Sequence, residues 1–162
     1  MRDEEENILV YGYGNPGRQD DALGIMLAGE IEKWSVEKGI DSIEIDMNYQ
    51  LNIEDAEKIS NFHTVIFADA SVNEMEHFKL QKVIPDMKTD FSMHAVTPSF
   101  VTGLCQRIYG KLPEVYQLEI RGYSWEFMQS VSKDALNNLR QATDFMVNYL
   151  EKKKKLKRTK NN

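Results

Sequence analysis

The stretch that decides the fold is Gly12-Tyr13-Gly14-Asn15-Pro16-Gly17-Arg18-Gln19-Asp20-Asp21, which follows the apolar run Ile8-Leu9-Val10-Tyr11. A glycine-rich turn between a buried first strand and an amphipathic helix is typical of folds whose backbone approaches a phosphate. This turn ends in two adjacent carboxylates, which would repel a phosphate. The shape of the turn therefore indicates a nucleotide fold, whereas its charge indicates a metal site or a general acid-base site.

Strands and helices are predicted to alternate along the rest of the chain, without repeats or low-complexity linkers. Hydrophobic periodicity predicts strands at 8–13, 42–46, 64–68, 77–83 and 115–120, and helices at 23–34, 53–59, 98–109 and 136–150. Single helices between strands imply right-handed crossovers and a mostly parallel sheet, with 77–83 as an edge strand. We predict one three-layer α/β/α domain over residues 1–151, with a five-stranded sheet, and a basic, disordered tail at 152–162.

Composition and charge exclude several classes of partner. The 162 residues carry a net charge of -6, but residues 151–162 hold seven Lys/Arg and one acid, so the preceding body is strongly acidic. An acidic body is a poor nucleic-acid binder, because affinity there comes mainly from neutralising phosphates. No apolar stretch approaches the ~20 residues of a membrane span, and the acidic N-terminus lacks the apolar segment of a secretory signal. We expect a cytoplasmic protein with neither a nucleic-acid partner nor membrane insertion.

Candidate site residues gather where the predicted strands end. In open α/β sheets, sites form in the crevice at the carboxyl ends of the strands. Asp20 and Asp21 follow the first strand, and Asp46 and Asp69 end the second and third. A carboxylate at the end of a buried strand is costly unless it finds a partner. His94 lies just ahead of the helix start at 97–98.

These candidates allow more than one interpretation. Asp20 and Asp21 both suit the positive N-terminus of a helix, which is the favoured role for Asp20, whereas Asp21 is evenly balanced between this role and a functional one. Asp69 is surrounded by apolar residues and is the clearer functional candidate, although it could cap a loop or helix. His94 is by default a structural histidine. Two carboxylates and one imidazole suit nickel, zinc or manganese, and the same trio could activate a water molecule.

Three glycines, Gly12, Gly14 and Gly17, match the dinucleotide fingerprint. The fingerprint requires a helix to open at the third glycine and an acid about twenty residues further on. Here four polar residues intervene, and Asp46 lies nearer thirty residues away. A nucleotide-binding module is therefore kept only as an alternative.

Cys105, the single cysteine, excludes an intramolecular disulfide and is predicted to be a buried core residue.

The order of these motifs resembles the nickel-iron hydrogenase maturation proteases over roughly residues 7–150. The resemblance rests on four segments in order: Gly12-Tyr13-Gly14-Asn15, Asp20-Asp21, Ala68-Asp69-Ala70 and Ser92-Met93-His94. It implies an endopeptidase that removes the C-terminal extension of the hydrogenase large-subunit precursor after nickel insertion. It also implies that Asp21, Asp69 and His94 are metal ligands, supported by the turn residues Gly12, Gly14, Asn15 and Asp20. The nickel would belong to the substrate and act as a recognition handle, so that no nucleotide or resident cofactor is expected.

The hypothesis that follows is metal-assisted hydrolysis of a peptide bond, with Asp21 or Asp69 as the catalytic carboxylate that orients or deprotonates water. An aspartic-protease-like variant, in which two carboxylates share a proton, stays open. A third possibility from another class is a non-catalytic, nickel-dependent checkpoint that binds the immature subunit. The chain contains no Gly-x-Ser-x-Gly motif, and its single cysteine is predicted to be buried. We therefore do not expect catalysis by a serine or cysteine nucleophile.

Overall fold

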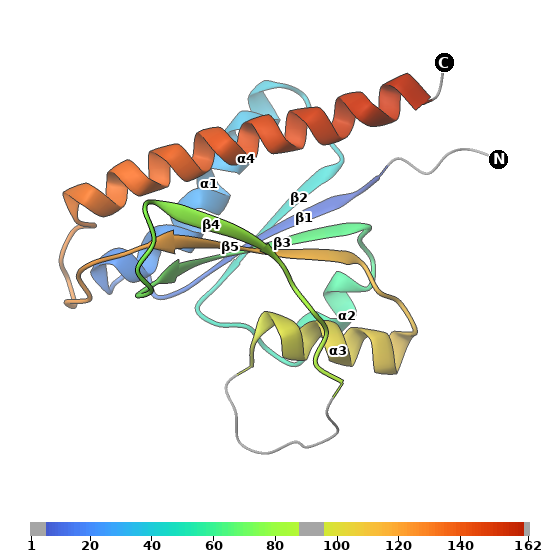
Figure 1. Cartoon of the computed structure of the whole chain (residues 1–162), viewed down its shortest axis with the longest axis horizontal. Helices are drawn as coiled ribbons and strands as arrows, with labels where there is room; N and C mark the ends of the chain where they lie inside the picture. The colour runs from blue at the N-terminus through green and yellow to red at the C-terminus, as the bar shows by residue number, and fades with distance from the viewer. Residues whose placement is uncertain (1–5, 88–95, 161–162) are drawn as a thin grey trace.

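The computed structural model describes residues 6–87 and 96–160, which form a five-stranded sheet between two layers of helices (Figure 1). The strand order is β2-β1-β3-β5-β4, parallel throughout except for β4, which runs antiparallel to β5 at one edge. The elements are β1 (Ile8–Tyr13), η1 (Gln19–Ala22), α1 (Leu23–Glu37), β2 (Ile43–Asn48), α2 (Asp55–Ile59), β3 (Thr64–Ser71), β4 (Phe78–Lys82), α3 (Pro98–Tyr109), β5 (Glu114–Arg121) and α4 (Lys133–Lys160).

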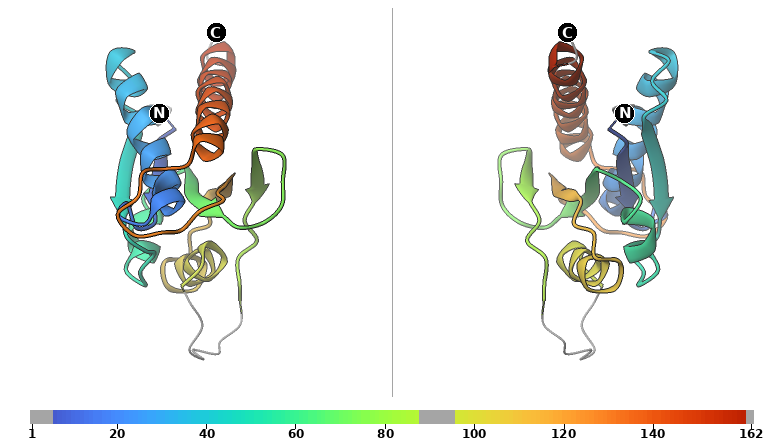
Figure 2. Two further views of the ribbon diagram at one scale, coloured as in Figure 1. Left: turned by 90° about the vertical axis from the view of Figure 1, so that its left-hand side faces the viewer. Right: turned by 90° about the vertical axis from the view of Figure 1, so that its right-hand side faces the viewer.

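Helices α1 and α4 cover one face of the sheet, and α2 and α3 cover the other (Figures 1 and 2). The predicted three-layer α/β/α fold with a mostly parallel sheet and an antiparallel edge strand is therefore confirmed. Alternate residues of each buried strand point to opposite faces, so each face receives its own apolar set.

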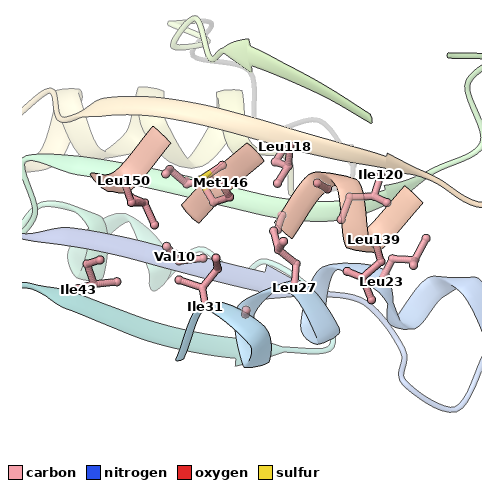
Figure 3. Packing of buried hydrophobic residues seen from close by; sticks show 14 of the residues in the cluster. Val10, Leu23, Leu27, Ile31, Ile43, Leu118, Ile120, Leu139, Met146 and Leu150 are labelled. Carbon is pink, nitrogen blue, oxygen red and sulfur yellow. The ribbon is translucent and has the colours of Figure 1, made fainter. Parts of the chain in front are cut away.

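Two hydrophobic cores lie on the two sides of the sheet. Figure 3 shows the core beneath α1 and α4, in which Val10 of β1 and Leu118 of β5 pack with Leu27 of α1 and Met146 of α4. The second core lies between the sheet and helices α2 and α3, and Cys105 is fully buried there. The predicted core role of this cysteine is confirmed, and burial raises the pKa of its thiol.

Helix α3 begins and ends as its sequence predicts. The Thr97 hydroxyl oxygen accepts a hydrogen bond from the Phe100 N–H at 3.2 Å, and Pro98 occupies the first helical position. Gly110 ends the helix in the left-handed conformation, with a φ of 65°. These caps fix the helix that follows the segment 88–95.

Helix α4 continues past residue 151, where we placed the end of the domain, into the basic segment as far as Lys160. The division into a domain at 1–151 and a tail at 152–162 stays a prediction. Among the helices in the described part of the chain, none combines the length and apolarity that crossing a bilayer requires.

Candidate active site

The turn after β1 is possible because two glycines let helix α1 pack directly against the sheet. A Cβ atom on Gly12 would overlap the carbonyl oxygen of Gly24, and one on Gly24 would overlap the carbonyl oxygen of Ala68. Helix α1 therefore starts in backbone contact with both β1 and β3. Gly24 is a supporting residue that the sequence interpretation missed, since its only signal is a glycine near the start of a predicted helix.

Backbone amides of the turn donate to acceptors of the chain itself. The Gly14 N–H donates to the Asn48 carbonyl at 3.1 Å, and the Gly17 N–H donates to the Asn15 side-chain oxygen at 2.9 Å. The Asn15 N–H donates to Oδ2 of Asp21 at 2.8 Å. Gly14 has a φ of +139°, and a Cβ there would overlap the carbonyl oxygen of Asp21. The turn is thus built around the Asp21 carboxylate.

Asp20 precedes Asp21 and lies in the first turn of the η1 helix, but its side chain bonds to the loop at 122–132. It is fully buried, and its carboxylate accepts hydrogen bonds from the N–H groups of Tyr123, Ser124 and Ser132 at 2.7, 3.0 and 2.8 Å. The Ser132 hydroxyl donates a fourth bond at 2.7 Å. Burial opposes ionisation of Asp20, but these bonds outweigh it and hold the pKa below its usual value.

Asp20 therefore lies at the start of the helical segment, as predicted, but its side chain does not cap it. No side chain caps α1 or the short η1 helix before it. The reason is that the loop at 122–132 offers Asp20 three backbone N–H groups and a hydroxyl, more donors than a capping side chain normally binds. Asp20 supports the turn by tying it to this loop.

Asp69 and Asp21 are the carboxylates that the structure brings together. Burial is the main cause that raises the pKa of Asp69 to about 7, and the charge of Asp21 is the second. Glu119 raises it further, whereas hydrogen bonds from the Ala70 N–H and the Tyr13 hydroxyl lower it. A carboxyl with a pKa near 7 can take up or release a proton at neutral pH, as a general acid or base must.

Strand β3 is longer than the sequence predicts. It runs to Ser71, because pairing with β5 continues as far as Ser71 opposite Arg121, so Asp69 lies within the strand and not at its end. Asp69 faces Glu119 across this ladder. The pairing of β3 with β5 continues before and after Asp69 in the chain, and it fixes the position of this residue.

The remaining sequence candidates have separate places. His94 falls in 88–95, outside the described residues, so its role as a ligand stays a prediction. Asp46 forms an ion pair with Lys58 at 3.0 Å. The other two histidines, His63 and His77, contact the side-chain oxygens of Asn7 and Asn138.

A metal ion would need more ligands than the two carboxylates provide. Across residues 6–87 and 96–160, no three His, Cys, Asp or Glu side chains are grouped so that they could hold a metal ion. Asp21 and Asp69 are oxygen donors of the type that a divalent transition metal accepts beside an imidazole. Further ligands would have to come from 88–95 or from a binding partner.

Three polar residues beside Asp69 were missed by the sequence interpretation. Tyr13 ends β1, and Gln117 and Glu119 lie on β5. Gln117 and Glu119 alternate along one strand, as do Phe67 and Asp69 in the paired strand. This alternation was the available signal, but it becomes usable only once the register between β3 and β5 is known.

No family model and no curated protein matches the sequence. Solved structures do match. The NiFe hydrogenase maturation protease HycI from Thermococcus kodakarensis has a TM-score of 0.69 at 17% identity, covering 92% of this chain and 95% of its own. The hydrogenase maturating endopeptidase HybD from E. coli has a TM-score of 0.66 at 19% identity, covering 91% and 93%.

A third similar structure, the hydrogenase 2 maturation peptidase from a Thaumarchaeota archaeon, has a TM-score of 0.63 at 20% identity and covers 90% of this chain and 98% of its own. All three likenesses extend over nearly the full length of both chains. At these identities they establish a shared architecture. The chain therefore has the fold of the nickel-iron hydrogenase maturation proteases, the family that its sequence motifs resemble.

Proposed function

We propose that this chain is an endopeptidase that removes the C-terminal extension of a nickel-iron hydrogenase large-subunit precursor after nickel insertion, and that it acts in the cytoplasm. The observation that carries the proposal is the placement of Asp69 beside Asp21, with a pKa raised to about 7. The shared fold and the order of the sequence motifs support the choice of substrate.

Nickel enters this proposal as part of the substrate. Asp21, Asp69 and His94 would complete the coordination of a nickel ion that the precursor carries, so that only a loaded precursor is bound productively. The carboxylates of Asp21 and Asp69 are hard oxygen donors, and an imidazole is a good nickel ligand. Such a scheme needs no resident metal, because the ligands on the protease are completed by those of the precursor.

The attack on the peptide bond would use a water molecule oriented by Asp69. An ionised Asp69 accepts a proton from that water, and its pKa near 7 leaves a useful fraction in each protonation state at neutral pH. The aspartic-type variant, in which Asp21 and Asp69 share a proton, is favoured by the same like-charge proximity. The two variants differ in whether the nickel contributes to the chemical step or only to recognition.

The test is incubation of nickel-loaded precursor with a sub-stoichiometric amount of the protein, followed by mass spectrometry of the released C-terminal peptide. We expect multiple turnovers by the unmodified chain and a loss of at least about a hundredfold in the Asp69→Asn variant, the scale of one missing acid-base group. Asp144→Asn is the matched control, because Asp144 is an exposed aspartate on α4. Full cleavage by Asp69→Asn would contradict the proposal.

The same experiment separates the alternatives. A nickel-dependent checkpoint would bind the loaded precursor without releasing a peptide. A nucleotide-binding module would be retained on a nucleotide resin irrespective of Asp21→Asn. The internal hydrogen bonds of the Gly14, Asn15 and Gly17 amides count against that module, since a phosphate would have to displace them.

A further inference from the structure

The hydroxyl of Tyr13 lies between the side chains of Gln117 and Asp69. Nε2 of Gln117 is 3.5 Å from the Tyr13 oxygen. Tyr13 and Asp69 directly follow the paired residues Gly12 and Ala68 of neighbouring strands, and the Tyr13 hydroxyl interacts with the Asp69 carboxylate as a hydrogen-bond donor. An amide N–H can only donate, and an ionised carboxylate can only accept. The hydrogen bonds therefore run in one direction, from Gln117 to Tyr13 to Asp69.

Packing holds the Tyr13 ring in the position that this chain of bonds requires. Its centroid lies 6.4 Å from that of Tyr11 and 6.4 Å from that of Phe67, in both cases with edge-to-face geometry. Such pairs have a preferred geometry and restrict the ring. The hydroxyl is thus presented to β3 from a fixed position on β1.

The Asp69 carboxylate has a second fixed donor, the backbone N–H of Ala70. Two donors that belong to different strands define the orientation of a carboxylate better than one does. Without Tyr13, the carboxylate would be held by a single backbone group and could rotate about its terminal torsion, which is broad for aspartate.

We propose that Tyr13 is a positioning residue that orients the Asp69 carboxylate, with Gln117 orienting the Tyr13 hydroxyl in turn. The inference rests on the proposed function, in which Asp69 acts on the attacking water. It goes beyond that function because it assigns a role to two residues outside the trio of Asp21, Asp69 and His94. A small displacement of an acting group is sufficient to slow a reaction substantially.

The same strand supplies a matched control. The Tyr11 hydroxyl donates to Oδ2 of Asp55 at 2.9 Å, and that oxygen also accepts the Asn52 N–H at 2.7 Å, at the start of α2. Tyr11 therefore makes the same kind of bond, two residues earlier, to an aspartate that holds a helix. Tyr11→Phe and Tyr13→Phe remove equivalent atoms with different expected consequences.

The experiment compares the two variants in cleavage of nickel-loaded precursor. We expect Tyr13→Phe to lower kcat by about tenfold or more at unchanged KM, because a hydrogen bond to a charged group is lost. Gln117→Leu should lower kcat in the same direction by a smaller factor. Tyr11→Phe should lower the midpoint of thermal unfolding and leave kcat unchanged. Equal kcat in Tyr13→Phe and the unmodified chain would overturn the inference, as would equal kcat losses in the two tyrosine variants.

A second measurement does not depend on activity. In protein labelled with ¹³C at the tyrosine Cζ, the Tyr13 resonance should shift in Asp69→Asn and in Gln117→Leu but not in Asp144→Asn. An unchanged Tyr13 resonance in Asp69→Asn would overturn the inference whatever the activity. A wild-type protein that cleaves no loaded precursor would instead contradict the proposed function.

Discussion

Asp20 and Asp69 are two aspartates of the candidate site whose pKa values move in opposite directions. Asp20 is fully buried, yet its pKa lies below the usual value. Asp69 is only partly buried, and its pKa is raised to about 7. Asp20 accepts four hydrogen bonds from the loop at 122–132, whereas Asp69 has two donors and two neighbouring acids. Burial opposes ionisation of both carboxylates: the four bonds to Asp20 outweigh it, whereas the two donors to Asp69 do not, and the charge of Asp21 adds to the effect.

This difference distinguishes the structural role of Asp20 from the chemical role proposed for Asp69. Around Asp20, backbone groups of 124–128 exchange further hydrogen bonds with residues 17–20, so the loop and the turn form one rigid unit. The ionised carboxylate of Asp20 accepts four hydrogen bonds that hold this unit together. Asp69, with fewer donors, keeps a carboxyl that can exchange a proton.

The largest expected effect is on stability, from Asp20→Asn. The amide has one acceptor oxygen, and its NH₂ group would face N–H donors, so we expect a loss of about 3 kcal/mol in the free energy of unfolding at pH 7. Urea denaturation measures it, with Asp144→Asn as a control that should change little. Because the folded pKa of Asp20 is lowered, its contribution is present above its ordinary pKa and is lost as the pH falls through the folded value. A loss that persists unchanged at lower pH would contradict this account.

An intermediate effect is expected from Gly24→Ala, which acts on the separation of Asp21 from Asp69. The added methyl would overlap the Ala68 carbonyl, so α1 must move away from β3 at a cost of about 1–3 kcal/mol. The pKa of Asp69 should fall as the charge of Asp21 recedes. Gly29 lies in the same helix with only a side-chain methyl 3.7 Å from an added Cβ, so Gly29→Ala should stabilise the protein by about 0.5–1 kcal/mol. Thermal unfolding of the two variants should therefore shift in opposite directions.

The sequence predicted the elements of the fold well, because hydrophobic periodicity and the caps of α3 are local signals. It placed Asp21 and Asp69 correctly at one end of the sheet for the same reason, since parallel strands bring their carboxyl ends together. It failed on the end of β3, because an Asp-Ala-Ser sequence is not typical of a strand and pairing with β5 extends it.

The role of Asp20 could not be predicted from local sequence. Its donors lie more than a hundred residues away, on a loop that no periodicity describes. Tyr13 was also missed, although it lies in the quoted turn, because its polar contacts depend on which strand lies beside β1. In both cases the missing information is tertiary: the partner of a polar group is set by topology, whereas its burial follows from the pattern.

The smallest effect that sharpens the comparison comes from Asp21→Asn. Burial is the first cause of the raised pKa of Asp69 and the charge of Asp21 only the second, so we expect the pKa to fall from about 7 by roughly one unit or less. A raised folded pKa means that the contribution of Asp69 to stability is complete below its ordinary pKa of 3.8 and is lost as the pH rises towards 7. In Asp21→Asn this loss should end at a lower pH.

Carboxyl ¹³C NMR titration measures the shift, and a pKa that stays near 7 would mean that burial, without Asp21, sets the charge state of Asp69. The shared-proton variant of the mechanism would then lose its basis, because it requires each carboxylate to respond to the charge of the other.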